Sequence, residues 1–223
     1  MSTVRPFRRG GFSYIELIGI LALTAILVAA VAPRLLEAIS DAKINRAVAV
    51  LKSLQTATAK YSADLGTLYP LSPAGVATPS PDGTPTEKGY GGSLPDALTL
   101  PKSGYPAITE AGLWRKFQGP YARAFPGTPP LGTTMTLSAV PSAPGTPTPG
   151  NATFTLTNNP NAGIAAGSPL VFARFEDVDR REFEKLDSIL DPGIGATVEK
   201  KHHLGKVKWD PKTSALLVYI AHR

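Results

Sequence analysis

The chain begins with a long apolar run that is followed by a one-sided helical pattern. Nearly every position from 12 to 33 is apolar, and residues 17–33 carry no charge. At about 1.5 Å per residue this run forms roughly 33 Å of helix, enough to cross a hydrocarbon core of about 30 Å. The pattern therefore predicts a membrane-spanning helix over 12–33.

Beyond Pro33 the same helix is predicted to continue with only one apolar face. Positions on this face recur every three to five residues, which is typical of a helix packed against a core. Leu65-Gly66 predicts the helix end, because glycine is favoured just past a helix C-terminus. Pro33 removes one backbone donor and is expected to bend the helix or open it locally. The positions on the apolar face are Leu36, Ile39, Ile44, Ala47, Leu51, Leu54, Thr58 and Tyr61.

The middle of the chain has few signals of regular structure. Residues 70–150 contain 16 prolines and 12 glycines, which favour loops and extended linkers. Residues 113–117 predict a short helix or strand that docks an aromatic side chain. Residues 133–140 and 152–157 alternate as two strands of a hairpin with a Pro-rich tip. This exposed region is interpreted as a flexible decoration in preference to a contact surface or a glycan carrier.

Regular structure is predicted again towards the C-terminus. Residues 170–175 read as a strand, and residues 180–190 as a helix with one apolar face. Asp177 or Asp179 can cap this helix. Two further strands surround the turn at 210–212, and they complete a terminal hairpin.

These patterns predict an α+β fold in which the second half of a long N-terminal helix packs on a small antiparallel sheet of four or five strands. The expected organisation is a basic leader (1–11), a membrane helix (12–33), its amphipathic continuation (34–66), Pro/Gly-rich loops with a hairpin (67–168) and a C-terminal strand, helix and hairpin (169–223).

The net charge of +6 is concentrated at the N-terminus. Arg5, Arg8 and Arg9 give the leader +3, and the remaining 212 residues carry only +3 more. No Lys/Arg stripe interleaved with aromatics is visible, so no nucleic-acid partner is expected. A basic leader before an apolar run favours a membrane with the N-terminus in the cytoplasm. The absence of cysteine excludes disulfides, thiolate metal sites and thiol catalysis.

Glu16 lies inside the apolar run, where an ionised carboxylate is costly. One interpretation is a carboxylate near the interface that reaches water. An ordinary secretory signal is a competing interpretation of the segment, with a cut after Ala30-Val31-Ala32. Pro33 would then follow the cut bond, which disfavours that cleavage.

Residues 8–17, Arg-Arg-Gly-Gly-Phe-Ser-Tyr-Ile-Glu-Leu, closely resemble the class III signal of type IV prepilins and type II secretion pseudopilins. The resemblance implies that a membrane-embedded prepilin peptidase cuts between Gly11 and Phe12 and that Phe12 becomes N-methylated. Glu16 matches the glutamate of that family, and Pro33 matches a proline that often bends its long helix. A carboxylate and the new ammonium of Phe12 can offset each other in an apolar environment, and the resemblance places that ammonium on a neighbouring subunit.

The resemblance implies a pilin-like fold and a bacterial structural subunit of a type IV pilus (a fimbrium) or of a type II secretion filament. Its expected partners are prepilin peptidase, further copies of the chain, other pilin-like subunits and an inner-membrane assembly platform. The subunit would cross the inner membrane once with its head outside the cytoplasm, and after assembly it would lie in a periplasmic or cell-surface filament. The alternative is a membrane-anchored extracytoplasmic binding protein with an uncleaved signal anchor.

No catalytic or cofactor signature accompanies this pattern. The chain shows no nucleophile elbow, P-loop or paired carboxylates in a recognisable frame, so it is not expected to be an enzyme or to carry a cofactor or metal. His202 and His203 are adjacent, which suits chelation poorly on a strand. Calcium is weighed as an alternative because major pseudopilins often bind it. The candidate ligands are spread along the chain, and capping or turn formation explains each of them: Asp177, Asp179, Asp187, Asp191 and Asp210.

Overall fold

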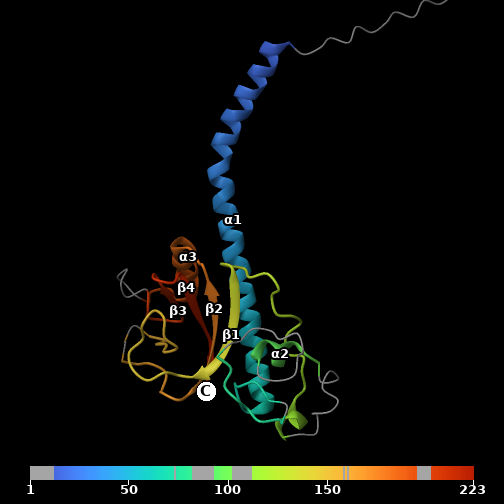
Figure 1. Cartoon of the computed structure of the whole chain (residues 1–223). Coiled ribbons are helices and arrows are strands. Elements are labelled where there is room, and N and C mark those ends of the chain that lie inside the picture. Colours follow the sequence, from blue (N-terminus) through green and yellow to red (C-terminus); the bar gives the residue numbers. More distant parts are fainter. Residues whose placement is uncertain are drawn as a thin grey trace, which may run out of the picture. The chain divides into compact units, whose positions relative to one another are not determined.

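The computed structural model describes residues 13–72, 74–81, 93–101, 112–157, 159, 161–194 and 202–223. These residues form an α+β arrangement of one long helix, shorter helices and a small antiparallel sheet (Figure 1). The chain divides into two compact units, residues 1–42 and residues 43–223, and the second unit is called the head below. The elements in chain order are α1 (Tyr14–Leu65), α2 (Leu94–Thr99), the 3-10 helix η2 (Gly112–Lys116), β1 (Thr134–Pro141), β2 (Pro169–Glu176), α3 (Arg180–Leu190), β3 (Val207–Asp210) and β4 (Ala215–His222).

The first unit contains the N-terminal half of α1. Helix begins at Tyr14 and is continuous through Pro33, so the loss of one backbone donor there does not break it. The prediction of a long helix ending at Leu65 is confirmed. Within the first unit, no described residue of α1 is buried.

The second half of α1 belongs to the head and buries one face. The predicted apolar face is confirmed from Ile44 to Tyr61. The helix ends at Gly66, whose φ of +73° needs glycine and whose N–H donates to the Ser62 carbonyl at 2.9 Å. The buried residues on this face are Ile44, Ala47, Leu51, Leu54, Ala57, Thr58, Tyr61 and Leu65.

The four strands of the described residues are antiparallel and lie in the order β1-β2-β4-β3. The predicted C-terminal hairpin is confirmed as β3 and β4. The predicted hairpin of 133–140 with 152–157 is wrong, because β1 pairs with β2 and residues 152–157 form only isolated bridges at Thr155. β2 lies between β1 and β4 and has apolar side chains on both of its faces, as suits a central strand.

Both faces of the sheet are covered. On β4, Leu216, Val218 and Ile220 point into the main core beneath α1 and α3, while Leu217 and Tyr219 point into a second cluster. This second cluster also holds Phe154, Leu170, Phe172 and Ala215. Phe154 is fully buried and comes from the Pro-rich part of the chain. The interpretation as a flexible decoration is therefore wrong for this part of the region, since Ala152, Phe154 and Ile164 pack on the second face.

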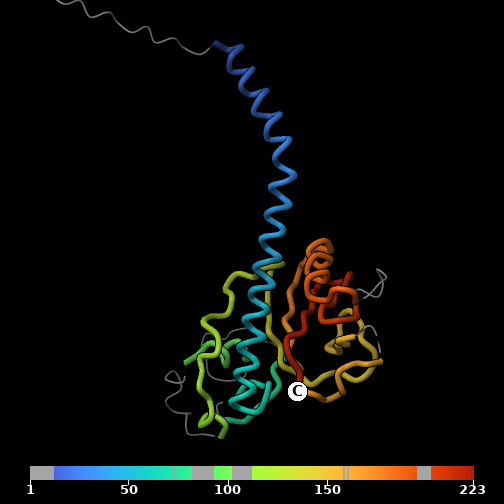
Figure 2. The backbone as a smooth tube through the Cα atoms, turned by 180° about the vertical axis from the view of Figure 1, so that it is seen from behind, coloured from blue at the N-terminus to red at the C-terminus, as the bar shows by residue number. Residues whose placement is uncertain are grey.

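The described residues of α2, η2 and the segment that follows η2 pack beside the second half of α1 (Figure 2). Trp114 in η2 stacks edge-to-face on Phe117, Phe117 on Tyr121, and Tyr121 on Tyr61 of α1, with ring centroids 5.1–5.5 Å apart. The Trp114 indole also donates to the Ser72 carbonyl at 2.8 Å. The predicted docking of an aromatic side chain at 113–117 is confirmed.

Candidate functional site

The candidate site is the apolar half of α1, because it exposes a large hydrophobic surface that no described residue of its own unit covers. An 18-residue window of the helix has a mean hydropathy of 2.6 with none of it buried, and α1 is long and apolar enough to cross a membrane. Leu27 is 65% exposed, and its neighbours are similar. The exposed large apolar residues of this half are Tyr14, Ile15, Leu17, Ile18, Ile20, Leu21, Leu23, Ile26, Leu27, Val28, Val31, Leu35, Leu36 and Ile39.

The surface of this helix offers only apolar contacts near its middle. A shallow hollow there has no polar lining and is formed by Leu27, Val28, Val31, Ala32 and Leu35. Thr24 carries the one side-chain hydroxyl of residues 17–33. This hydroxyl donates to the Leu21 carbonyl at 2.9 Å and so needs no outside partner. A lipid tail or another apolar helix is the kind of partner that such a surface accepts.

Glu16 forms a capping box with Ser13 at the start of α1. The Ser13 hydroxyl accepts the Glu16 N–H at 3.3 Å, and the Glu16 carboxylate accepts the Ser13 N–H at 3.3 Å. The two contacts satisfy backbone donors that a helix start leaves open, and the negative charge favours the positive end of the helix dipole. Sequence reasoning missed this role, although Ser-x-x-Glu before an apolar run is its signature.

The other predicted processing residues cannot be placed beside Glu16. Gly11, Phe12 and the leader 1–11 lie outside the described residues. Pro33 lies inside α1, 17 residues or about 26 Å beyond Glu16 along the axis, so the structure does not bring the two together.

The five aspartates weighed as calcium ligands have separate tasks. Asp179 caps α3, and Asp210 accepts N–H and O–H donors in the β3–β4 turn. Asp177 accepts the Thr133 hydroxyl at 2.8 Å. Asp187 is buried within α3, and Asp191 ends that helix. Within the described residues, no group of three or more His, Cys, Asp or Glu side chains could hold a metal ion.

Asp191 is a buried carboxylate that ties the end of α3 to the start of β3. It is 3% exposed, and one oxygen accepts the N–H groups of Lys206 and Val207, the latter at 2.8 Å. Burial raises the pKa of this carboxyl, and the two backbone donors partly oppose that rise. Gly205 has a φ of +90°, and a Cβ there would lie 2.5 Å from the carboxylate. These contacts hold the C-terminal end of α3 against the start of β3.

His202 packs as an aromatic ring. It stacks on Phe183 of α3 and lies beside Trp209 of β3, with ring centroids 5.5 and 5.2 Å away. Burial lowers the pKa of the imidazole, and the nearby Arg180 guanidinium lowers it further. A neutral, stacked imidazole at this place joins α3 to the sheet.

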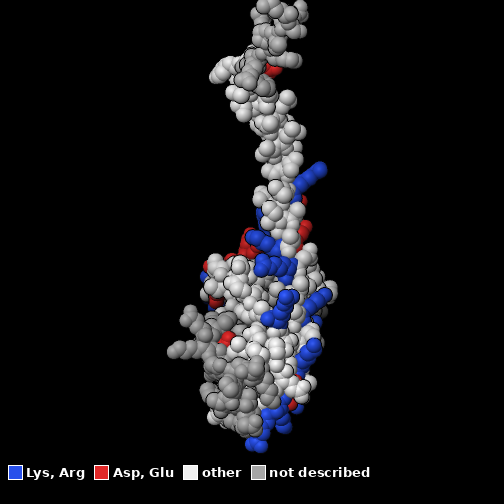
Figure 3. Space-filling model, turned by 90° about the vertical axis from the view of Figure 1, so that its right-hand side faces the viewer, with Lys and Arg blue, Asp and Glu red and all other residues white. Residues whose placement is uncertain are grey.

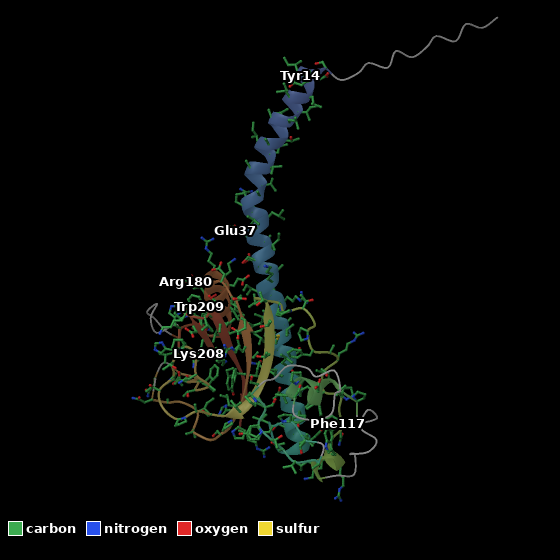
Figure 4. All side chains as sticks on the ribbon, in the orientation of Figure 1. Tyr14, Glu37, Phe117, Arg180, Lys208 and Trp209 are labelled. Atoms are coloured by element: carbon green, nitrogen blue, oxygen red, sulfur yellow. The ribbon has the colours of Figure 1, made fainter. Side chains whose placement is uncertain are left out.

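Lys208 is a buried polar side chain that sequence reasoning missed altogether. Its side chain is fully buried on β3 (Figure 4) and donates to the backbone oxygens of Asn151 and Thr153 at 2.7 and 2.8 Å, and to the Asn151 side chain at 2.7 Å. The ammonium also lies 4.9 Å from the centre of the Phe154 ring. Burial lowers the pKa of this amine to about 7. Lys208 therefore fastens residues 151–154 to the second face of the sheet.

Comparison of the chain with family models, with curated proteins and with solved structures finds no match.

Proposed function

We propose that the chain is the structural subunit of a bacterial type IV pilus-like or type II secretion filament. The apolar half of α1 would hold the subunit in the inner membrane until prepilin peptidase removes residues 1–11. The observation that carries the proposal is this helix, which is apolar around its whole circumference and which no described residue of its unit covers; in the sequence its apolar run follows Gly11 directly. Lateral packing of such helices in a filament replaces lipid contacts by protein contacts.

Glu16 gives the proposed assembly its axial register. In the processed chain Phe12 carries a free ammonium one helical turn before Glu16, and the carboxylate can leave its cap to pair with the ammonium of a neighbouring subunit. Both groups are costly when unpaired in an apolar environment, so each offsets the cost of the other. The capping box keeps the carboxylate satisfied while the subunit waits in the membrane.

The first test is the N-terminus of the mature chain. Intact-mass and N-terminal peptide measurements on protein from its own membrane should find a chain that begins at methylated Phe12. Gly11→Val should leave the leader attached because the peptidase site is lost, whereas Gly10→Ala serves as the matched control and should still be trimmed. Normal trimming of Gly11→Val would contradict the proposed processing site.

The second test separates the charge of Glu16 from its capping role. Glu16→Gln keeps the capping contacts, because glutamine also forms capping boxes, but it removes the charge. It should be processed and membrane-bound and yet give few or no sheared filaments, as should Glu16→Val. Ser13→Ala removes the cap acceptor and keeps the charge, so it should still assemble. Normal filaments from Glu16→Gln would refute the pairing role.

The same preparations distinguish the alternative, an anchored binding protein. That protein would keep Met1 at its N-terminus and would give no sheared filaments, whatever residue stands at position 16. A mature chain that keeps Met1, or a preparation without sheared filaments, would by itself contradict the filament proposal.

A further inference from the structure

The head carries a basic face that the sequence does not reveal. Six exposed basic side chains lie on α1, on η2 and on the segment that follows η2, with Asp64 as the acidic residue among them. Figure 3 shows one side of the molecule on which Lys and Arg side chains follow one another along the head and outnumber the acidic ones. The basic face is defined as Arg46, Lys52, Lys60, Arg115, Lys116 and Arg123.

Residues 121–128 lie extended along α1 and bring distant parts of the chain together. At one end the Tyr121 ring stacks edge-to-face on Tyr61, with centroids 5.5 Å apart. At the other end the Arg46 guanidinium donates to the Thr128 carbonyl at 3.4 Å. These anchors are about 22 Å apart along α1, and the seven intervening steps of an extended chain cover about 23 Å. The segment therefore runs antiparallel to the helix and carries its one arginine beside it.

The basic face continues from residues 121–128 onto η2, beyond the point where Tyr121 contacts Tyr61. Phe117 joins the two parts, because its ring packs on both Trp114 and Tyr121. Trp114 and Phe117 are buried, whereas the neighbouring Arg115 and Lys116 are exposed. The aromatic anchors thus fix the backbone that presents these two charges.

On α1 the three basic side chains share one open sector. At 100° per residue, Arg46, Lys52 and Lys60 fall within a sector of about 120° around the helix axis, and they are spread over about 21 Å along that axis. The residues between them are short, and Ser53 and Thr56 turn their hydroxyls back to carbonyl oxygens of the helix. The long basic side chains therefore stand above their surroundings and can reach one partner together.

The face holds the whole charge excess of the head. Residues 43–223 contain 19 Lys and Arg against 14 Asp and Glu. Six of these cations and Asp64 belong to the basic face, so the rest of the head is balanced. Asp64 itself lies within hydrogen-bonding reach of the Tyr121 hydroxyl, which engages part of its carboxylate. The clustering therefore points to a polyanionic partner.

We propose that the basic face binds the phosphate backbone of duplex DNA without regard to sequence. A duplex presents about one negative charge per 1.7 Å along a line, which suits charges spread along a helix, whereas a bilayer presents a plane. The described aromatic side chains beside the face, on α1, η2 and residues 121–128, are buried or half-buried. The face therefore offers no platform for stacking unpaired bases. The inference stands on the head alone and holds whether or not the chain assembles into a filament.

The test uses the full chain in a neutral detergent and a short fluorescent duplex of mixed sequence. Fluorescence anisotropy between 50 and 200 mM salt should give a Kd that weakens with salt, in the range of about 10⁻⁶–10⁻⁴ M at physiological salt. The variant Lys52→Gln/Lys60→Gln/Arg123→Gln should bind at least about tenfold more weakly, and its log–log salt slope should fall by about 2.7, since each phosphate contact contributes about 0.9.

A matched control removes the same charge elsewhere. Arg181→Gln/Lys185→Gln/Lys212→Gln should change the Kd less than about twofold, because these residues lie on the balanced part of the head. Equal weakening by both triple variants would show that only net charge matters and would overturn the assignment. The assignment would also be overturned if the chain bound vesicles of anionic phospholipid but not DNA, or if it bound neither at 50 mM salt.

Discussion

The two halves of α1 are one helix built for two different surroundings. From Tyr14 to residue 42 no described side chain is buried, and the apolar ones point in every direction. From Lys43 to Leu65 a single face is buried in the head, and the opposite face carries Arg46, Lys52 and Lys60. The first half is therefore incomplete without an apolar partner, while the second half can keep its open face in water.

This difference shows where the stability of the chain resides. Burial of apolar surface is the main favourable term in folding, and in the described residues it is confined to the head. The first half gains such burial only from lipid or from other helices. The head should thus unfold as a unit whose stability is nearly insensitive to the surface of the first half.

The largest expected effect comes from a matched pair of leucines on the same helix. Leu54 is 2% exposed and Leu27 is 65% exposed. Leu54→Ala should lower the free energy of unfolding of the head by about 2–5 kcal/mol, because it leaves a cavity in the main core. Urea unfolding in detergent, followed by the fluorescence of the two buried tryptophans, measures this change.

Leu27→Ala is the control for that measurement. It should alter the unfolding of the head by less than about 0.5 kcal/mol, as exposed substitutions usually do. If Leu27→Ala shifted the transition as strongly as Leu54→Ala, the two halves of α1 would form one cooperative unit and the comparison would fail.

Lys208 is fully buried in the head, and the pH dependence of the head's stability tests the effect of that burial. Between pH 7 and 10 the unfolded chain keeps the Lys208 proton, whereas the folded chain, with a pKa of about 7, has lost it. The unfolded state then binds more protons, so stability should rise with pH by about 1.4 kcal/mol per unit at most. The three oxygens that accept the ammonium protons oppose this trend and make the rise shallower.

Urea midpoints of the head from pH 7 to 8.5 measure this slope, because few tyrosines of the unfolded chain ionise there. Lys208→Met should flatten the profile, since it removes the titrating group and keeps a long apolar stem. A wild-type profile without any rise would mean that the buried amine keeps its proton and that its pKa is not lowered.

Local patterns predicted those parts of the fold that local physics decides. The full length of α1, the Asp179 cap with α3, and the β3–β4 hairpin follow from helical and strand periodicity and from turn residues. The pairing of β1 with β2 is non-local and could not be read from spacing. The cover of the second face by Ala152, Phe154 and Ile164 was equally hidden, because these residues follow or lie within a Pro-rich stretch.

The candidate site divides in the same way. Gly11, Phe12 and Glu16 were singled out because a short motif carries them, and the capping role of Glu16 was also legible in that motif. The buried Lys208 had no signal, since its acceptors lie more than 50 residues away. The basic face was invisible because α1 and Arg123 meet only when residues 121–128 lie along the helix.

The smallest expected effect compares the caps of two helices, one in each unit. Asp179 accepts the Arg181 N–H at 3.4 Å at the start of α3, and Ser13 accepts the Glu16 N–H at the start of α1. Asp179→Ala should lower the free energy of unfolding of the head by about 1 kcal/mol, since it leaves a backbone donor of a packed helix unpaired. Ser13→Ala removes a similar contact from the first unit, so the urea midpoint of the head should not move. A shift of that midpoint by Ser13→Ala would mean that the start of α1 is coupled to the head through some 30 residues of helix. In that case the uncovered half would be part of the folding unit and not an appendage awaiting its apolar partner.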